Sequence, residues 1–128
     1  MIAVLDTCAL VWAALSPVEM TPAARAVVED PANDFLVSSI SLWEIALKVK
    51  RGRLDLGMPV RGFVHRLESM GNMEIVAVTT QLWLRSVELE WEHPDPADRI
   101  IVATADLRGV PIVTADTRIR GYYANVVW

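Results

Sequence analysis

Short apolar runs alternate along the chain with longer segments in which apolar residues recur every three or four positions. The short runs predict buried β-strands, and the recurring pattern predicts amphipathic helices. The expected strands are residues 2–5, 35–39, 74–78, 110–114 and 126–128. The expected helices are residues 22–30, 41–50, 59–70, 80–90 and 96–109, with a turn or short helix near Arg118. This alternation predicts an α/β fold, a three-layer sandwich with a mainly parallel central sheet.

Several predicted helices start at residues that can cap them. Thr21 and Asp95 each stand directly before a proline. Proline suits the first helical position, and the preceding side-chain oxygen can accept hydrogen bonds from free backbone amides. Ser41 and Glu44 have the spacing of a capping box. No linker, low-complexity tract or repeat interrupts the series, so we expect a single domain over residues 1–128.

The chain shows no pattern typical of a membrane or secreted protein. Its longest unbroken apolar run, Cys8 to Leu15, has eight residues, whereas a membrane-spanning helix needs about 20. Asp6 interrupts the apolar N-terminal segment and no Lys or Arg precedes Arg25, unlike in a signal peptide. We therefore expect a soluble cytoplasmic protein that binds no membrane. Cys8 is the single cysteine, and we expect it to be a buried free thiol.

The formal net charge of −4 argues against a uniformly basic surface that binds nucleic acid. Divalent cations held by some of the acids would offset much of this negative charge. A basic cluster stands at the end of one predicted helix and comprises Lys48, Lys50, Arg51 and Arg53. These cations either complement the helix dipole and stay solvated, or they meet the phosphates of a nucleic acid.

Four acids occupy places that a parallel sheet would bring together. Asp6 and Asp116 closely follow predicted strands, while Glu44 and Asp98 fall in the first turns of predicted helices. All these places belong to the carboxyl edge of the strands, where open α/β sheets bind ligands. Crowded carboxylates repel one another unless cations compensate them, and hard oxygen ligands favour Mg²⁺ or Mn²⁺. Such a metal centre can promote attack of water on a phosphodiester.

Some of these acids also have a structural explanation. Glu44 completes the capping box, and Asp98 can favour a helix N-terminus electrostatically. Asp95 is best explained as a helix cap. Asp6, by contrast, directly follows four apolar residues and needs a partner if it is buried. Asp6 is therefore the strongest single candidate for a functional acid.

Other kinds of chemistry lack their sequence motifs. The glycines are scattered and form neither a phosphate loop nor a dinucleotide-binding pattern, and no nucleophile elbow occurs. His65 and His93 are expected to be isolated, so nothing indicates a zinc site. Arg99 either contacts a phosphate or pairs with an acid. The five tryptophans are assigned to the core or to protein contacts rather than to base stacking.

Four segments follow one another in a recognisable order: Leu5–Thr7, Ser38–Ile45, His93–Arg99 and Val113–Asp116. Their order and spacing resemble those of PIN-domain nucleases, in particular the VapC-type toxins of bacterial toxin–antitoxin pairs. The resemblance extends over essentially the whole chain.

The resemblance implies a metal-dependent endoribonuclease that hydrolyses RNA. The acids that match the family's cluster around Mg²⁺ or Mn²⁺ are Asp6, Glu44, Asp98 and Asp116. Thr114 matches a hydroxyl beside this cluster. The resemblance also implies a homodimer and a cognate antitoxin, a segment of which blocks the site, often with a basic residue against the acids.

The chain departs from the family pattern after Asp116. Thr117 and Arg118 stand where many relatives have another acid. This difference leaves open how many metal ions bind and how much Asp116 contributes.

Two other hypotheses compete with a nuclease. One is a catalytically silent PIN-like module that serves only for dimerisation or partner binding. The other is a phosphoacceptor receiver domain, which also has clustered acids in an α/β fold. A receiver needs an acceptor aspartate after a central strand and a suitably placed lysine. The second predicted strand ends in Ser38 and Ser39, and no lysine follows Lys50, which argues against it.

Overall fold

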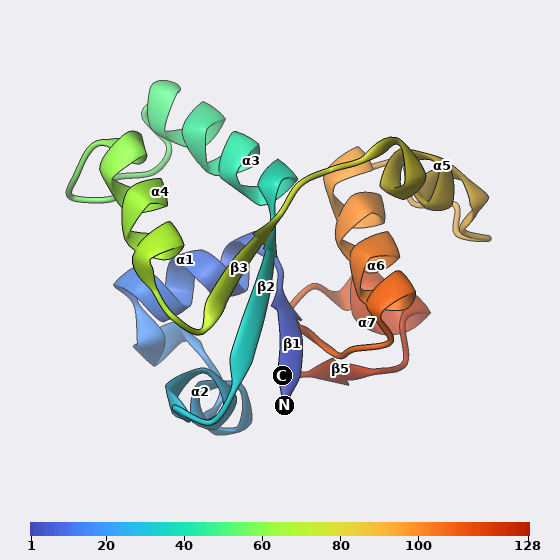
Figure 1. The fold of residues 1–128 in the computed structure, drawn as a ribbon, viewed down its shortest axis with the longest axis horizontal. Helices are drawn as coiled ribbons and strands as arrows, with labels where there is room; N and C mark the ends of the chain where they lie inside the picture. Colours follow the sequence, from blue (N-terminus) through green and yellow to red (C-terminus); the bar gives the residue numbers. More distant parts are fainter.

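Five parallel strands form one sheet in the order β3–β2–β1–β4–β5 in the computed structural model, which describes residues 1–128 (Figure 1). The strands are β1 (Ile2–Leu5), β2 (Asp34–Ser38), β3 (Met73–Val76), β4 (Ile112–Val113) and β5 (Val126–Val127). The sheet is wholly parallel, where the sequence predicted a mainly parallel one. Because β1 lies between β2 and β4, the receiver-domain hypothesis is wrong, since receivers have the order 2-1-3-4-5.

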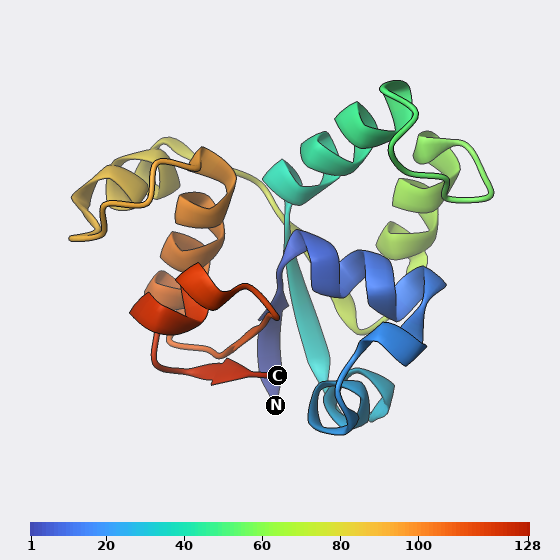
Figure 2. The same cartoon turned by 180° about the vertical axis from the view of Figure 1, so that it is seen from behind.

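Helices cover both faces of this sheet, which confirms the predicted three-layer sandwich (Figures 1 and 2). On the left in Figure 1 lie α1 (Thr7–Leu15), α2 (Pro22–Glu29), α3 (Ser39–Lys50) and α4 (Val60–Ser69). On the right lie α5 (Thr80–Glu88), α6 (Pro96–Arg108) and α7 (Thr117–Tyr122). A single 3₁₀ turn, η1 (Pro17–Glu19), connects α1 to α2. None of the helices is both long enough and apolar enough to span a bilayer.

The alternation of side chains along the strands divides the core in two. Val4 packs into the layer of α5, α6 and α7, whereas its neighbours Ala3 and Leu5 pack into the opposite layer. In β2, Leu36 and Val37 alternate in the same way. Strands buried on both faces read as continuous apolar runs, which is why the sequence pattern located them.

Helix α1 was not among the predicted elements, because its residues are almost all apolar and show no helical alternation. The Asp6 side chain caps it by accepting a hydrogen bond from the Ala9 amide at 2.7 Å. Trp12 packs against Trp128, with 5.5 Å between ring centroids. The prediction of a buried Cys8 is wrong, because its position on α1 leaves the side chain exposed.

Two of the predicted caps are confirmed and one is not. Thr21 accepts a hydrogen bond from Ala24 at 3.2 Å, and Asp95 caps α6. The capping box of Ser41 and Glu44 is wrong, because α3 starts earlier and is capped by Ser38. Glu44 therefore lies in the second turn of α3 rather than the first, and its carboxylate is not used for capping.

Candidate functional site

The strand order reverses direction between β1 and β4, and this switch point is where open parallel sheets bind ligands. Leu5 pairs with Val37 on one side and with Val113 on the other. The residues that follow these strands therefore reach the same edge of the sheet. A hollow at this edge is lined by Asp6, Thr7, Cys8, Trp12, Glu44, Lys48, Asp98, Ala115 and Asp116. All four acids singled out in the sequence line this one hollow.

Asp6 is the most deeply buried of the four acids, with only 5% of its surface exposed. One carboxylate oxygen accepts the Ala9 amide, and the other accepts a hydrogen bond from the hydroxyl of Thr114. The pKa of Asp6 is raised from 3.8 to about 6, chiefly by burial. The hydrogen bonds from Thr114 and Ala9 oppose this rise, and the charges of Asp98 and Asp116 add to it. A buried carboxylate with a raised pKa is a group that a bound cation would stabilise.

Glu44 is held by Thr7, which also contacts Ser41. The Thr7 hydroxyl lies 2.5 Å from Glu44 Oε1 and 2.9 Å from the hydroxyl of Ser41. Thr7 and Ser41 are both buried, so this polar chain links the start of α1 to α3 inside the protein. Burial raises the pKa of Glu44, while the hydrogen bond from Thr7 lowers it.

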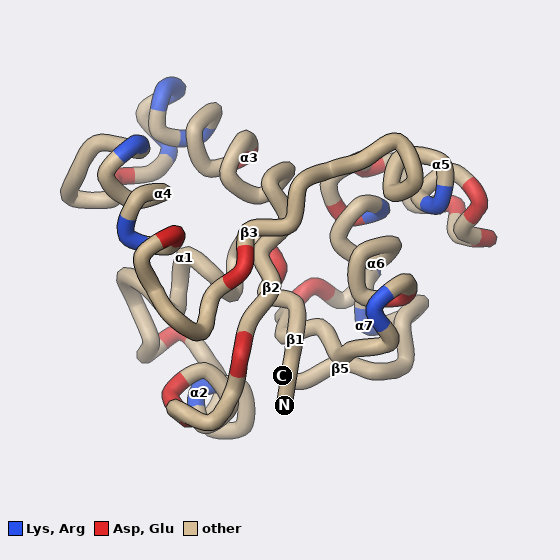
Figure 3. The backbone as a smooth tube through the Cα atoms, viewed as in Figure 1, with Lys and Arg blue, Asp and Glu red and all other residues tan.

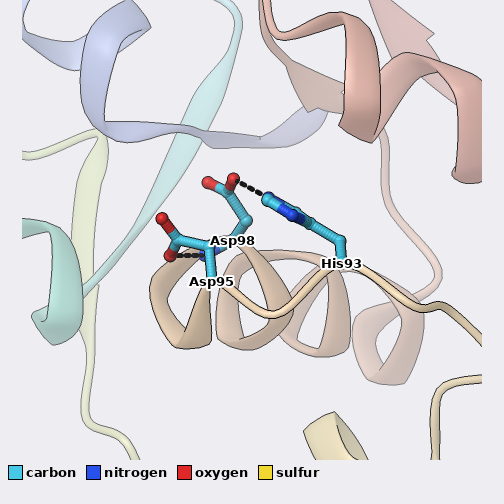
Figure 4. A group of neighbouring side chains, drawn as sticks. All are labelled: His93, Asp95 and Asp98. Carbon is cyan, nitrogen blue, oxygen red and sulfur yellow. Dashed lines mark hydrogen bonds and ion pairs between the residues drawn. The ribbon is translucent and has the colours of Figure 1, made fainter.

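Asp98 stands in the first turn of α6 and contacts His93, as Figure 4 shows. The distance from His93 Nε2 to Asp98 Oδ2 is 2.6 Å. Burial raises the pKa of Asp98, and the hydrogen bond with His93 opposes that shift. The prediction that His93 is isolated is therefore wrong. Its ring is buried, packs against Trp91 and lies with Nδ1 3.3 Å from an Arg118 guanidinium nitrogen.

Arg99 explains how His93 reaches this place. Its guanidinium donates hydrogen bonds to four backbone carbonyls that lead up to α6, those of Ser86, Leu89, Trp91 and His93. The side chain therefore ties down the loop before α6. Arg99 pairs with no acid in this structure, because its donors are directed at carbonyl groups. A contact between Arg99 and a phosphate stays a prediction.

Asp116 caps α7 and faces the same hollow. Its Oδ1 accepts hydrogen bonds from the amides of Arg118 and Ile119, at 2.8 and 3.0 Å. The amide of Asp116 itself donates to the hydroxyl of Thr114 at 3.0 Å. Because both capping bonds use Oδ1, Oδ2 is free for another ligand.

The donor set suits a hard divalent cation. Four carboxylates line the hollow, and burial raises the pKa of three of them, Asp6, Glu44 and Asp98. Lys48 is the single basic residue among the lining residues. Oxygen ligands of this kind fit Mg²⁺ or Mn²⁺. The hydrogen-bonded oxygens of Asp6, Glu44 and Asp98 each accept one bond and keep a further lone pair for coordination, while Asp116 offers its free Oδ2.

A nearby group of His93, Asp95 and Asp98 also brings potential ligand atoms within 4.8 Å of one another (Figure 4). Asp95 uses one oxygen to accept the amides of Ala97 and Asp98. His93 Nε2 is already bonded to Asp98. We therefore interpret this group as hydrogen-bonded support for Asp98 rather than as a separate metal centre.

Sequence reasoning missed several residues that support the acids. Thr7 and Ser41 lie inside segments that carry the family resemblance, but nothing in the pattern tells which acid their hydroxyls contact. His93 stands five positions before Asp98, and neither helical nor strand periodicity predicts a contact at this spacing. The conformation of the loop between them brings the two side chains together. Proximity to a candidate acid in the sequence is the one signal that would have drawn attention to them.

The fold and the hollow define a class of protein, the parallel α/β sandwich with an acidic hollow at its switch point. The family model described as "PIN domain" matches residues 3–125. The chain therefore belongs to the PIN-domain family.

Similar proteins are found by sequence and by structure. Ribonuclease VapC22 of Mycobacterium tuberculosis is 32% identical over 119 residues, which cover 92% of this chain and 89% of that protein. The structure of VapBC2 from Rickettsia felis bound to a promoter DNA fragment has a TM-score of 0.69 at 18% identity. A toxin–antitoxin complex from Klebsiella pneumoniae has a TM-score of 0.65 at 21% identity. Both structural matches cover 98% of this chain and 96% of the other.

Proposed function

We propose that this protein is a metal-dependent endoribonuclease and the toxin of a toxin–antitoxin pair. The observation that carries the proposal is the convergence of four carboxylates at the switch point of the sheet. Family membership and the 32% identity to a protein named as a ribonuclease support it. In this proposal, the ligands of Mg²⁺ or Mn²⁺ are Asp6, Glu44, Asp98 and Asp116.

The roles of the residues follow from their contacts. A bound divalent cation supplies the positive charge that offsets repulsion between the phosphodiester and the attacking water. Thr114 holds Asp6 in a fixed orientation, and His93 does the same for Asp98. Glu44, held at one oxygen by Thr7, keeps its other oxygen for the cation. Asp116 presents its free oxygen to the same hollow.

The proposed partners are RNA, a cognate antitoxin and a second copy of the chain. The solved structures with similar folds include one named as a toxin–antitoxin complex and one named as VapBC2 bound to promoter DNA. The first of these supports an antitoxin partner. RNA is encountered in the cytoplasm, and we place the protein there. A single cysteine that can form no internal disulfide agrees with a reducing compartment. Light scattering of the purified protein will determine whether it is a dimer.

The decisive experiment follows cleavage of end-labelled structured and unstructured RNAs with Mg²⁺, Mn²⁺ or EDTA. Wild type is compared with Asp6→Asn and Asp98→Asn. Asp34→Asn is the matched control, because Asp34 is exposed at the opposite end of β2 and loses the same charge. We expect metal-dependent cleavage by wild type and by Asp34→Asn, and none by the other two variants.

The alternative, a catalytically silent PIN-like module, predicts a different result. Folded wild-type protein would then leave every RNA intact and would bind neither Mg²⁺ nor Mn²⁺ by calorimetry. Cleavage by Asp6→Asn at the wild-type rate would also contradict the assignment of the site.

A further inference from the structure

The acidic hollow continues into a groove along α1. A second hollow shares Thr7, Cys8, Trp12 and Lys48 with the acidic one and adds Val11, Arg53 and Leu54. A third shares Val11, Trp12 and Leu54 with the second and extends to Leu15, Ser16 and residues 55–57. We call the second and third hollows the α1 groove. It lies between α1 and the loop after α3 and opens directly onto the carboxylates.

Two cations line the part of this groove nearest the acids, Lys48 and Arg53. Lys48 stands four positions after Glu44, so both side chains lie on the same face of α3. Gly52 adopts the left-handed conformation with φ of 68°, and the chain then turns back over the helix. The Arg53 amide donates to the Lys48 carbonyl at 2.8 Å. This turn brings Arg53 beside Lys48 at the groove.

The basic cluster is divided by its position in the structure. Figure 3 shows Lys and Arg gathered at the far end of α3. Of this cluster, Lys50 and Arg51 line none of the hollows along α1, whereas Lys48 and Arg53 do. Complementing the helix dipole would explain all four cations alike. It does not explain why Lys48 lines the acidic hollow, and Arg53 the hollow next to it, without an ion pair to any acid. Exposed, unpaired cations next to an acidic centre are suited to a bound polyanion.

Trp12 adds an aromatic surface to the same path. It lines the acidic hollow and both parts of the α1 groove. Its ring is partly exposed and packs against Trp128. Cations for phosphates beside an aromatic ring for bases are the usual elements of a single-strand binding groove.

We propose that the α1 groove binds single-stranded RNA on one side of the cleaved bond, with Lys48 and Arg53 contacting backbone phosphates and Trp12 contacting a base. This inference rests on the proposed nuclease function and adds a substrate path to it. A basic antitoxin segment is a poorer occupant, because Lys48 and Arg53 would repel it. Lys48 and Arg53 make the part of the groove nearest the acids complementary in charge to a phosphate backbone, while Asp55 lines its far part.

The test measures RNA binding without cleavage. A fluorescein-labelled single-stranded RNA is titrated in EDTA and followed by anisotropy, using Lys48→Ala, Arg53→Ala and the double variant. Lys50→Ala and Arg51→Ala are the controls, since they remove equal charge outside the groove. We expect each groove variant to weaken binding about fivefold, and the controls less than about twofold. The log–log slope of affinity against salt should become shallower by about 0.7 for each phosphate that the variant no longer neutralises.

Cleavage assays provide a second measurement. If a phosphate is bound equally in the ground and transition states, removing its cation raises KM and leaves kcat at saturating RNA unchanged. The proposed role of the groove would be wrong if the double variant bound RNA with wild-type affinity. It would also be wrong if the control variants weakened RNA binding as much as the groove variants do. Preferential binding of duplex RNA would contradict it as well.

The outcomes separate this inference from the proposed function. If the groove variants no longer bind RNA but wild type cuts no RNA, the binding groove stands and the nuclease function fails. If wild type cuts RNA and the groove variants bind and cut as well as wild type, the nuclease stands and the groove fails. Thermal melting of each variant shows whether it is folded.

Discussion

Thr114 donates a hydrogen bond from its buried hydroxyl to Asp6, which lies 108 positions earlier in the chain. The two residues follow neighbouring central strands, β4 and β1. The same hydroxyl accepts the amide of Asp116 at 3.0 Å. One side chain therefore fixes both a buried carboxylate and the backbone that carries a second acid.

Replacing Thr114 by valine keeps its shape and removes both hydrogen bonds. We expect the free energy of unfolding to fall by about 1–3 kcal/mol, because one oxygen of the buried Asp6 carboxylate and the Asp116 amide lose their hydrogen-bond partner. RNA cleavage should fall as well, since Asp6 is no longer oriented. Urea unfolding and the cleavage assay measure the two effects.

Thr104→Val is the control for that change. Thr104 is also buried, but its hydroxyl donates to the Ile100 carbonyl within α6 and contacts no acid. The Thr104→Val variant should lose some stability and cleave RNA at the wild-type rate. An equal loss of activity in both variants would mean that Thr114 acts through general stability alone.

Asp6→Asn should stabilise the metal-free protein at neutral pH. The pKa of Asp6 is raised from 3.8 to about 6 in the folded protein, so above about pH 6 its buried charge opposes folding. As pH falls through 6 the folded protein takes up a proton that the unfolded chain takes up only near 3.8, and wild type regains stability. The advantage of the variant, at most about 3 kcal/mol, should vanish near pH 4.

Urea unfolding in EDTA across this pH range measures the difference between the two proteins. Glu44 and Asp98 have raised pKa values in both, so their contributions largely cancel in the comparison. Added Mn²⁺ should reverse the order at neutral pH by stabilising wild type alone. If Asp6→Asn were less stable than wild type at every pH, the buried charge of Asp6 would not destabilise the metal-free protein as we expect.

His93 should act on metal affinity through Asp98. His93→Leu removes the hydrogen bond to Asp98 and should weaken Mn²⁺ binding by about tenfold or more. His93→Gln keeps a donor and should restore part of that affinity. Calorimetric titration of Mn²⁺ measures this directly, without cleavage. If His93→Leu bound Mn²⁺ with the same affinity as wild type, His93 would have no role in metal binding.

Arg99→Lys should loosen the loop before α6. Lysine keeps the positive charge but cannot reach the four carbonyls that the guanidinium contacts. We expect faster amide hydrogen exchange over residues 86–95 and little change in the strands. If exchange in this loop stays slow, other contacts hold it in place.

The strands of the sheet and the meeting of the carboxylates at one edge could both be predicted from the sequence. Apolar runs locate buried strands, and parallel strands bring the residues that follow them to one edge, so Asp6 and Asp116 were expected to meet. Helix α1 was not predictable from periodicity, since its apolar residues cover all sides. The exposure of Cys8 depends on where that helix packs.

The pattern of apolar and polar residues did not predict the hydrogen bonds that support the acids, for a different reason. His93 meets Asp98 because Arg99 bends the loop before α6, and no periodicity encodes that bend. Thr7 reaches Glu44 through the packing of α1 on α3. The division of the basic cluster likewise follows from the turn at Gly52.

The central position of β1 also bears on how the molecule is made. This strand is synthesised before both of its neighbours in the sheet, and β4, which leads to Thr114 and Asp116, comes after α6. A nascent chain therefore carries Asp6 long before the residues that complete the carboxylate cluster exist. Until translation has passed β4, the growing polypeptide has no complete set of carboxylates with which to hold a divalent cation.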